Sequence, residues 1–159
     1  MATNRVLVTC PPMLGMFDAF VAPALELGLE LVPAEVTQTL SEAELIELLP
    51  QFDGWIIGDD PASQQVFKAG QSGSLKAAVK WGIGVDNVDF KACEALGIPI
   101  INTPGMFGGE VADVAVGPED APRQNEVQCV LLYQAALHEL QRRSAHTTIV
   151  KDKALLIAE

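Results

Sequence analysis

One segment, residues 77–105, constrains the fold more than any other part of this chain. Its apolar and turn-forming residues predict a strand at 77–81, a turn at 82–87, a helix at 88–96 and a strand at 99–101. Gly97 stands just past the helix, where a C-terminal cap favours glycine. The turn Asn102–Gly105 ends the second strand.

The residues before this segment repeat the alternation of strand and helix. Strands are predicted at 5–9, 29–33 and 54–58, and helices at 16–27, after Ser41, and at 62–69. Ser41 and Glu44 have the spacing of a capping box. This alternation with short connections predicts an α/β fold. It is a flavodoxin-like, doubly wound, five-stranded parallel sheet in the order 2-1-3-4-5, with helices on both faces and a helical C-terminal tail.

Two irregular segments follow predicted strands and are candidate walls of a ligand site. In doubly wound folds the carboxyl ends of the strands line the ligand crevice. The proline-containing loop Cys10–Gly15 lies outside the sheet and is either such a wall or an ordinary connection. For Asp59 and Asp60, a solvated turn that caps the next helix is a simpler interpretation than a metal or acid–base site.

Composition and charge restrict the class of partner. The chain has 159 residues, enough for one domain with a sizeable core, and 49% of them are hydrophobic, which argues against disorder. The formal net charge of -11 disfavours nucleic acid and anionic membranes as partners. No signal peptide and no membrane-spanning apolar run are found, so a cytoplasmic location is expected.

The cysteines, Cys10, Cys93 and Cys129, are far apart and form no C-x-x-C pair. We expect free thiols in a reducing cytoplasm. With only two histidines in the chain, these residues make no zinc ligand set, and no metal site is predicted. Trp55 and Trp81 lie in predicted strands and are expected in the core.

The segment 77–105 and its continuation resemble a known family. The motifs are WGIGVDNVD at 81–89, GIPIINTPG at 97–105 and GGEVAD at 108–113. In this order they resemble the substrate-domain signature of the D-2-hydroxyacid dehydrogenases, and the D-3-phosphoglycerate dehydrogenase type above all. The resemblance implies the substrate-binding domain of an NAD-dependent oxidoreductase.

The resemblance also implies a nucleotide-binding domain that has no counterpart in this sequence. No G-x-G-x-x-G fingerprint is present, since the third glycine is absent after Gly82-Ile83-Gly84. We therefore expect an isolated substrate domain, excised or engineered, with no cofactor of its own, although the parent family uses NAD. The expected parts are a flavodoxin-like substrate domain at 1–104, a crossing helix and splice linker at 105–122, and a C-terminal helical segment at 123–159 that packs back on the domain.

The family's catalytic groups have no matching residues here. Its hydride transfer needs an Arg that holds the substrate carboxylate and a His–Glu acid–base pair. His138 and His146 lie in the predicted helical tail, where a surface histidine is the simpler interpretation. We predict no catalytic residues and no dehydrogenase activity for the chain alone.

One substrate-binding element of the family is retained. It consists of the backbone N–H groups in the turn after the fourth strand, which here belong to Ile83, Gly84 and Val85. Glycine lets the backbone approach an anion, and successive amides form an anion-binding nest. Asp86 and Asn87 are expected to hold the turn and cap the helix at Val88. The alternative is that the turn has only an architectural role.

Three functions remain open at this point. The favoured one is an isolated substrate domain without chemistry. The others are a weak binding module for 2-hydroxy or 2-oxo carboxylates or phosphorylated acids, and one half of a split NAD-dependent oxidoreductase. A homodimer is expected, and exchange of the segment after Pro104 between copies is one form of it. The reason is that the predicted helix at 109–116 lacks its usual partner domain.

Overall fold

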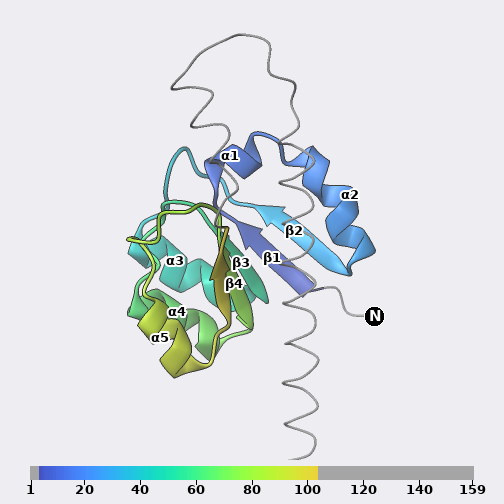
Figure 1. Ribbon diagram of the computed structural model, residues 1–159. Coiled ribbons are helices and arrows are strands. Elements are labelled where there is room, and N and C mark those ends of the chain that lie inside the picture. The colour runs from blue at the N-terminus through green and yellow to red at the C-terminus, as the bar shows by residue number, and fades with distance from the viewer. Residues whose placement is uncertain (1–3, 104–159) are drawn as a thin grey trace, which may run out of the picture.

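A parallel sheet with strand order β2-β1-β3-β4-β5 organises the structure (Figure 1). The computed structural model describes residues 4–103. The strands are β1 (Asn4–Val8), β2 (Leu29–Pro33), β3 (Gly54–Ile57), β4 (Ala77–Lys80) and β5 (Ile100–Asn102). In the register of the three strands around β1, Val6 pairs with Leu31 of β2 and with Gly54 of β3. The predicted fold class and strand order are confirmed.

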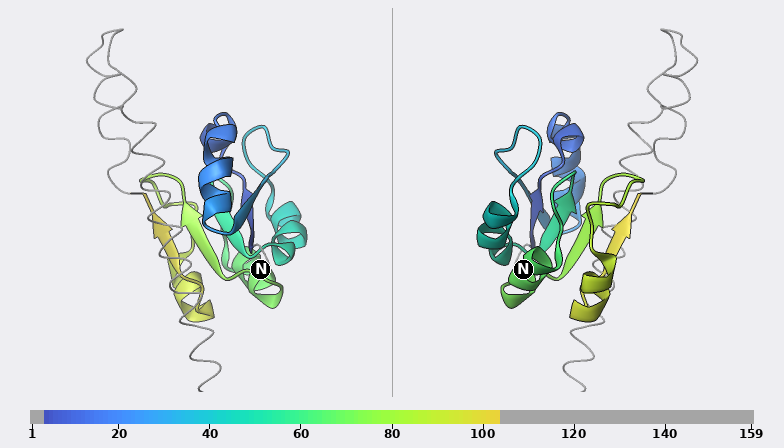
Figure 2. Two further views of the ribbon diagram at one scale, coloured as in Figure 1. Left: turned by 90° about the vertical axis from the view of Figure 1, so that its right-hand side faces the viewer. Right: turned by 90° about the vertical axis from the view of Figure 1, so that its left-hand side faces the viewer.

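Helices cover both faces of this sheet (Figure 2). They are α1 (Pro11–Leu14), α2 (Asp18–Glu26), α3 (Glu42–Leu48), a 3-10 turn η1 (Leu49–Gln51), α4 (Gln64–Ser72) and α5 (Phe90–Leu96). One face of the sheet packs against α1 and α2, and the other packs against α3, α4 and α5. Within residues 4–103, no helix has the length and apolar character needed to cross a bilayer.

The two-residue period of the strands divides the core into two clusters. Trp55 and Ile57 of β3 point into the cluster under α3 and α4, whereas Ile56 points into the cluster under α1 and α2. Trp55 packs on Phe67 with ring centroids 5.8 Å apart. The tryptophans are 1% and 7% exposed at positions 55 and 81, so their predicted core placement is confirmed.

Local signals set several helix ends as predicted. Ser41 and Glu44 form the capping box at the start of α3, with the Ser41 N–H donating to the Glu44 carboxylate at 2.8 Å. This bonding lowers the pKa of Glu44. Gly97 ends α5 in the left-handed conformation, with φ of 68°.

Two predicted helix starts are wrong. Asp89, and not Asp86 or Asn87, caps α5 by accepting the Ala92 N–H at 2.9 Å. Likewise α4 is capped by the Ser63 hydroxyl, and not by the aspartates at 59 and 60. In both places several cap-forming residues stand close together, and contacts with distant residues decide which of them caps.

The segment predicted as a loop at 10–15 contains the short helix α1. Pro11 and Pro12 occupy its first turn, where a missing N–H costs nothing. Met13 is fully buried from this helix. The predicted helix 16–27 is correspondingly shorter and begins at Asp18.

The predicted linker at 105–122 and C-terminal segment at 123–159 lie outside the described residues. Cys129, His138 and His146 lie there too. The division into 1–104, 105–122 and 123–159 therefore stays a prediction.

Candidate functional site

The turn Gly82–Asn87 lies at the carboxyl end of β4 and is held by the end of β5. The Gly82 N–H donates to the Thr103 hydroxyl at 2.8 Å, and the Thr103 N–H donates back to the Gly82 carbonyl at 3.2 Å. The Asn102 side chain donates to the Ile83 carbonyl at 3.4 Å. Gly82 has φ of 144°, a conformation that other residues adopt only with strain.

The predicted binding residues share this turn. Among residues 4–103, the N–H groups of Ile83, Gly84 and Val85 donate to no acceptor. The Ile83 side chain is 51% exposed, and Gly84 is exposed as well. Successive amides without acceptors at a strand's carboxyl end can bind an anion.

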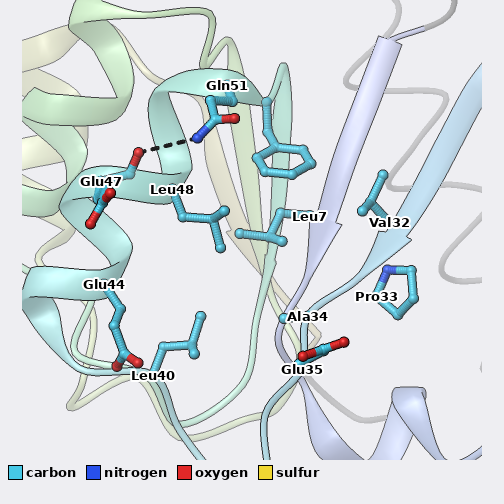
Figure 3. A pocket seen from close by; sticks show the side chains of 11 residues that line it. Leu7, Val32, Pro33, Ala34, Glu35, Leu40, Glu44, Glu47, Leu48 and Gln51 are labelled. Carbon is cyan, nitrogen blue, oxygen red and sulfur yellow. Dashed lines mark hydrogen bonds between the residues drawn. The ribbon is translucent and has the colours of Figure 1, made fainter.

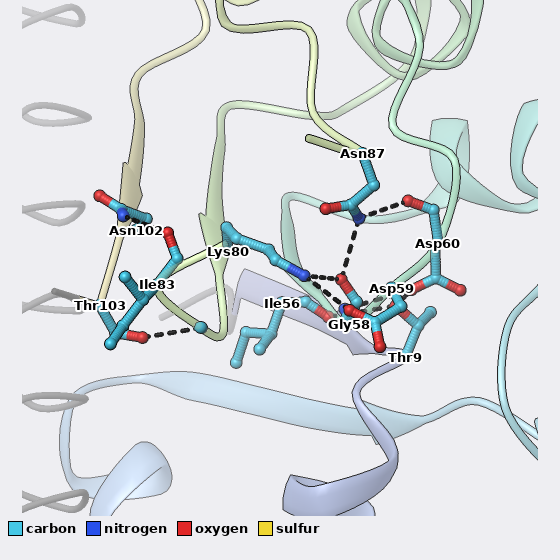
Figure 4. A network of polar contacts seen from close by, with 11 residues as sticks. Thr9, Ile56, Gly58, Asp59, Asp60, Lys80, Ile83, Asn87, Asn102 and Thr103 are labelled. Atoms are coloured by element: carbon cyan, nitrogen blue, oxygen red, sulfur yellow. Dashed lines mark hydrogen bonds and ion pairs between the residues drawn. The ribbon is translucent and has the colours of Figure 1, made fainter. Parts of the chain in front are cut away.

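Asn87 joins this turn to the end of β3 (Figure 4). Its side-chain amide donates to the Gly58 carbonyl at 3.1 Å and to the Asp60 carbonyl at 2.7 Å. Its backbone carbonyl accepts the Ala62 N–H at 2.9 Å. The turn is therefore fixed on both sides, by β5 and by the segment that follows β3.

Asp60 is buried, so its prediction as part of a solvated turn is wrong. Its side chain accepts hydrogen bonds from the Thr9 hydroxyl, the Leu40 N–H at 2.9 Å and the Gly58 N–H at 3.2 Å. These donors come from the ends of β1 and β3 and from the segment before α3. A buried carboxylate is stable only with such partners.

Lys80 is a site residue that the sequence analysis missed. It lies in the apolar run 77–81 and is 3% exposed. Its ammonium group donates to the Gly58 carbonyl and to Asp59 Oδ1, the latter at 3.0 Å. The sequence does contain a signal for this contact. A lysine in a strand that is buried on both faces needs a partner, and Asp59 follows the neighbouring strand.

The cysteines within residues 4–103 are free and buried. Burial raises the pKa of Cys10 to about 11, although a hydrogen bond from the Met13 backbone and the charge of Lys80 act in the opposite direction. Burial also raises the pKa of Cys93 to about 12. Neither thiol is a reactive nucleophile at neutral pH.

A separate groove of about 400 Å³ lies between β2 and α3 (Figure 3). Its floor is apolar, with Leu7, Val32 and Leu48, and its rim carries the carboxylates of Glu44 and Glu47. None of its lining residues belongs to the turn 82–87, so it is no part of the candidate site.

The described residues offer no site of their own for a metal or a dinucleotide. Among positions 4–103, no three His, Cys, Asp or Glu side chains gather as metal ligands. The helix start that follows the glycine turn is occupied by the Asp89 carboxylate, which would repel a pyrophosphate. The start of α5 therefore does not fit the phosphates of NAD.

Together, the sheet order and the glycine turn define a flavodoxin-like α/β domain with a turn of unpaired amides at the carboxyl edge of the described sheet. The chain belongs to the family of the D-isomer specific 2-hydroxyacid dehydrogenase catalytic domain, whose model matches residues 16–156.

Similar proteins come from several organisms. The chain is 33% identical over 85 residues to a hydroxypyruvate reductase of Thermotoga maritima, covering 52% of this chain and 27% of that protein. It is 32% identical over 76 residues to a D-3-phosphoglycerate dehydrogenase of Synechocystis, covering 47% and 13%. The chain thus spans about a quarter or less of these relatives.

Solved structures confirm the fold. A 3-phosphoglycerate dehydrogenase of Entamoeba histolytica matches with a TM-score of 0.60 and 21% identity, over 86% of this chain and 52% of that one. A D-lactate dehydrogenase of Escherichia coli matches with a TM-score of 0.59 and 21% identity, over 71% and 35%.

The expectation of no cofactor is corrected by these comparisons. The Entamoeba structure is of an enzyme with NAD⁺ bound, and the family to which this chain belongs is one of dehydrogenases. A missing glycine fingerprint does not imply a missing cofactor, because the family's cofactor belongs to the enzyme as a whole.

Proposed function

We propose that residues 4–103 form the substrate-binding part of an NAD-dependent D-2-hydroxyacid dehydrogenase. The turn Gly82–Val85 binds the carboxylate of the substrate. The observation that carries this proposal is the row of amides at Ile83, Gly84 and Val85, which have no acceptor among the described residues. Ile83 and Gly84 are exposed, and Val85 is half-buried. The family membership of the chain supports the choice of a hydroxy acid as ligand.

In this proposal the described residues bind and orient the substrate. The amides hold the carboxylate, and the bonds of Asn87 and Thr103 keep the amides in place before the ligand arrives. NAD is bound by groups outside residues 4–103, and no step of hydride transfer is assigned to the described side chains.

The substrate that we propose to test first is 3-phosphoglycerate. Relatives named as D-3-phosphoglycerate dehydrogenases, from Synechocystis and from Archaeoglobus fulgidus, support this choice. Hydroxypyruvate is the second candidate, since the Thermotoga relative is named as its reductase. For residues 4–103 we propose weak binding of such acids without turnover, because these residues contain no histidine to serve as the acid–base group.

An amide-resolved NMR titration of the full chain tests this function. We expect 3-phosphoglycerate or hydroxypyruvate to shift the amide signals of Ile83, Gly84 and Val85 at millimolar concentration. Signals of the exposed helix face at Lys68 should not move, which excludes a general salt effect. Unchanged turn signals at tens of millimolar of every acid would show that the turn has only an architectural role.

We also propose a cytoplasmic homodimer, with segment exchange after Pro104 as one form of it. The free thiols of Cys10 and Cys93 support the cytoplasmic location. The dimer is supported by the predicted helix at 109–116, which lacks its usual partner domain. Sedimentation velocity measures the assembly. A single monomeric species at high concentration would refute the dimer.

A further inference from the structure

Lys80 is a buried lysine whose side chain passes Gly82, the first residue of the turn, and ends at Gly58 and Asp59. The residue is 3% exposed, and its Cε lies 3.6 Å from the position that a Cβ on Gly82 would take. A buried charge is stable only when acceptors or counter-charges surround it. The position of this positive charge is therefore set by the fold, unlike that of a mobile surface lysine.

The acceptors of Lys80 differ in how firmly they are held. The Gly58 carbonyl belongs to the backbone after β3, which Asn87 also holds. The Asp59 carboxylate, by contrast, is on a side chain that is 85% exposed. Since the ammonium has three donors, one donor is left without an acceptor among residues 4–103.

We propose that Lys80 supplies the positive charge of the substrate site and that an anionic oxygen of the substrate replaces Asp59 on it. This inference rests on the proposed function and extends it to the charge of the ligand. Figure 4 shows the contact of Asp59 with Nζ. Because the Asp59 side chain is 85% exposed, a ligand oxygen can take its place on Nζ once that side chain rotates away. Carboxylate and phosphate oxygens both fit this chemistry.

The net negative charge of the chain explains why a positive charge at the site would matter for an anionic ligand. The net charge of -11 repels any anionic substrate, and the amides of the turn carry only partial positive charges. A full charge at the end of the strand that leads into this turn offsets that repulsion locally. Asp59 then acts as an internal competitor, which neutralises Lys80 while the site is empty.

The test compares two variants that each remove one negative charge. Asp59 pairs with Lys80, whereas Glu94 is exposed on α5, outside the turn, and has no bond to Lys80. The full chain is titrated with inorganic phosphate, D-lactate and 3-phospho-D-glycerate, while NMR follows the amides of Ile83–Val85 and the Lys80 ammonium. We expect D59N to tighten binding about fivefold and E94Q to change it less than about twofold.

A third variant, K80Q, removes the charge and keeps a hydrogen-bond donor. It should weaken binding about fivefold while the turn amides still shift. If K80Q does not fold, the comparison of D59N with E94Q decides alone, because both side chains are exposed. In the wild type the Lys80 ammonium signal should move on addition of the anion. Movement with phosphate alone assigns the subsite to a phosphoryl group, and movement with D-lactate assigns it to the carboxylate.

Equal effects of D59N and E94Q would show only a general charge effect and would overturn the role of Lys80, with the proposed function left standing. The same holds for turn amides that shift while the Lys80 ammonium does not. No shift at the turn in any variant would overturn both proposals.

Discussion

At the scale of single residues, Asp60 connects three parts of the chain through one buried carboxylate. Its two oxygens accept hydrogen bonds from three groups: the Leu40 N–H, the Gly58 N–H and the Thr9 hydroxyl. Asp60→Asn puts an NH₂ donor against at least one of them. We expect the free energy of unfolding to fall by about 2 kcal/mol, because an unpaired buried donor costs about 1–3 kcal/mol. Urea unfolding followed by tryptophan fluorescence measures the change.

The matched control is Asp86→Asn, which removes the same charge from an exposed position. It should change the free energy of unfolding by less than about 0.5 kcal/mol. An Asp60→Asn variant as stable as this control would mean that the hydrogen bonds of Asp60 do not stabilise the fold.

The buried thiols predict a loss of stability at high pH. Burial raises the pKa values of Cys10 and Cys93 to about 11 and about 12, above the ordinary value of 9.0. Between pH 9 and 11 the unfolded chain therefore loses thiol protons that the folded chain retains, so the free energy of unfolding falls as pH rises. Urea midpoints at pH 8 and pH 10.5 measure this loss. The double variant Cys10→Ala and Cys93→Ala should lose less stability over the same interval, and an equal loss would assign the effect to other groups.

At the scale of elements, the sequence predicted what depends on local pattern and missed what depends on distant partners. The strands, the capping box at Ser41 and the cap at Gly97 follow from residues a few positions apart. The start of α5 could not be predicted this way. Asn87 and Asp89 are equally good cap residues, and the bonds of Asn87 to Gly58 and Asp60 decide between them.

The same reason explains the errors at the candidate site. The turn 82–87 follows from its glycines, a local signal, and its binding role follows from the resemblance to the family's motif. The burial of Lys80 and Asp60 follows from the neighbouring ends of β1, β3 and β4, which only the strand order brings together. With the strand order predicted, a search for partners of charged residues at adjacent strand ends identifies both Lys80 and Asp60.

Gly97 permits a quantitative test of an element's end. Gly97→Ala should lower the free energy of unfolding by about 1 kcal/mol, because alanine at φ of 68° is strained although its Cβ would meet no atom within 4 Å. Gly84→Ala is the control, since Gly84 also has open space around it and no positive φ. It should leave the stability nearly unchanged. Thermal unfolding of both variants compares them, and equal costs would show that the backbone conformation at Gly97 is not the cause.

At the scale of the whole molecule, stability should decrease from the centre of the sheet toward the β2 edge. All residues of β3 and β4 are buried, whereas only Leu29 is buried in β2. Opening β2 exposes little apolar surface. Opening β3 exposes apolar surface in both core clusters, because its side chains belong to both. We expect the amides of β3 and β4 to exchange with solvent only by global unfolding. Those of β2 should open at a free energy lower by about 2 kcal/mol or more.

Native-state hydrogen exchange in increasing urea separates these cases. For amides that exchange by global unfolding, the free energy of opening falls with urea as steeply as the free energy of unfolding does. For β2 amides the free energy of opening should fall less steeply. Equal dependence in β2 and β3 would mean that the sheet opens as one unit. The expected gradient has a consequence for the candidate site, because the turn 82–87 continues directly from β4. Its amides are then supported by one of the most stable strands, and a ligand does not have to order them on binding.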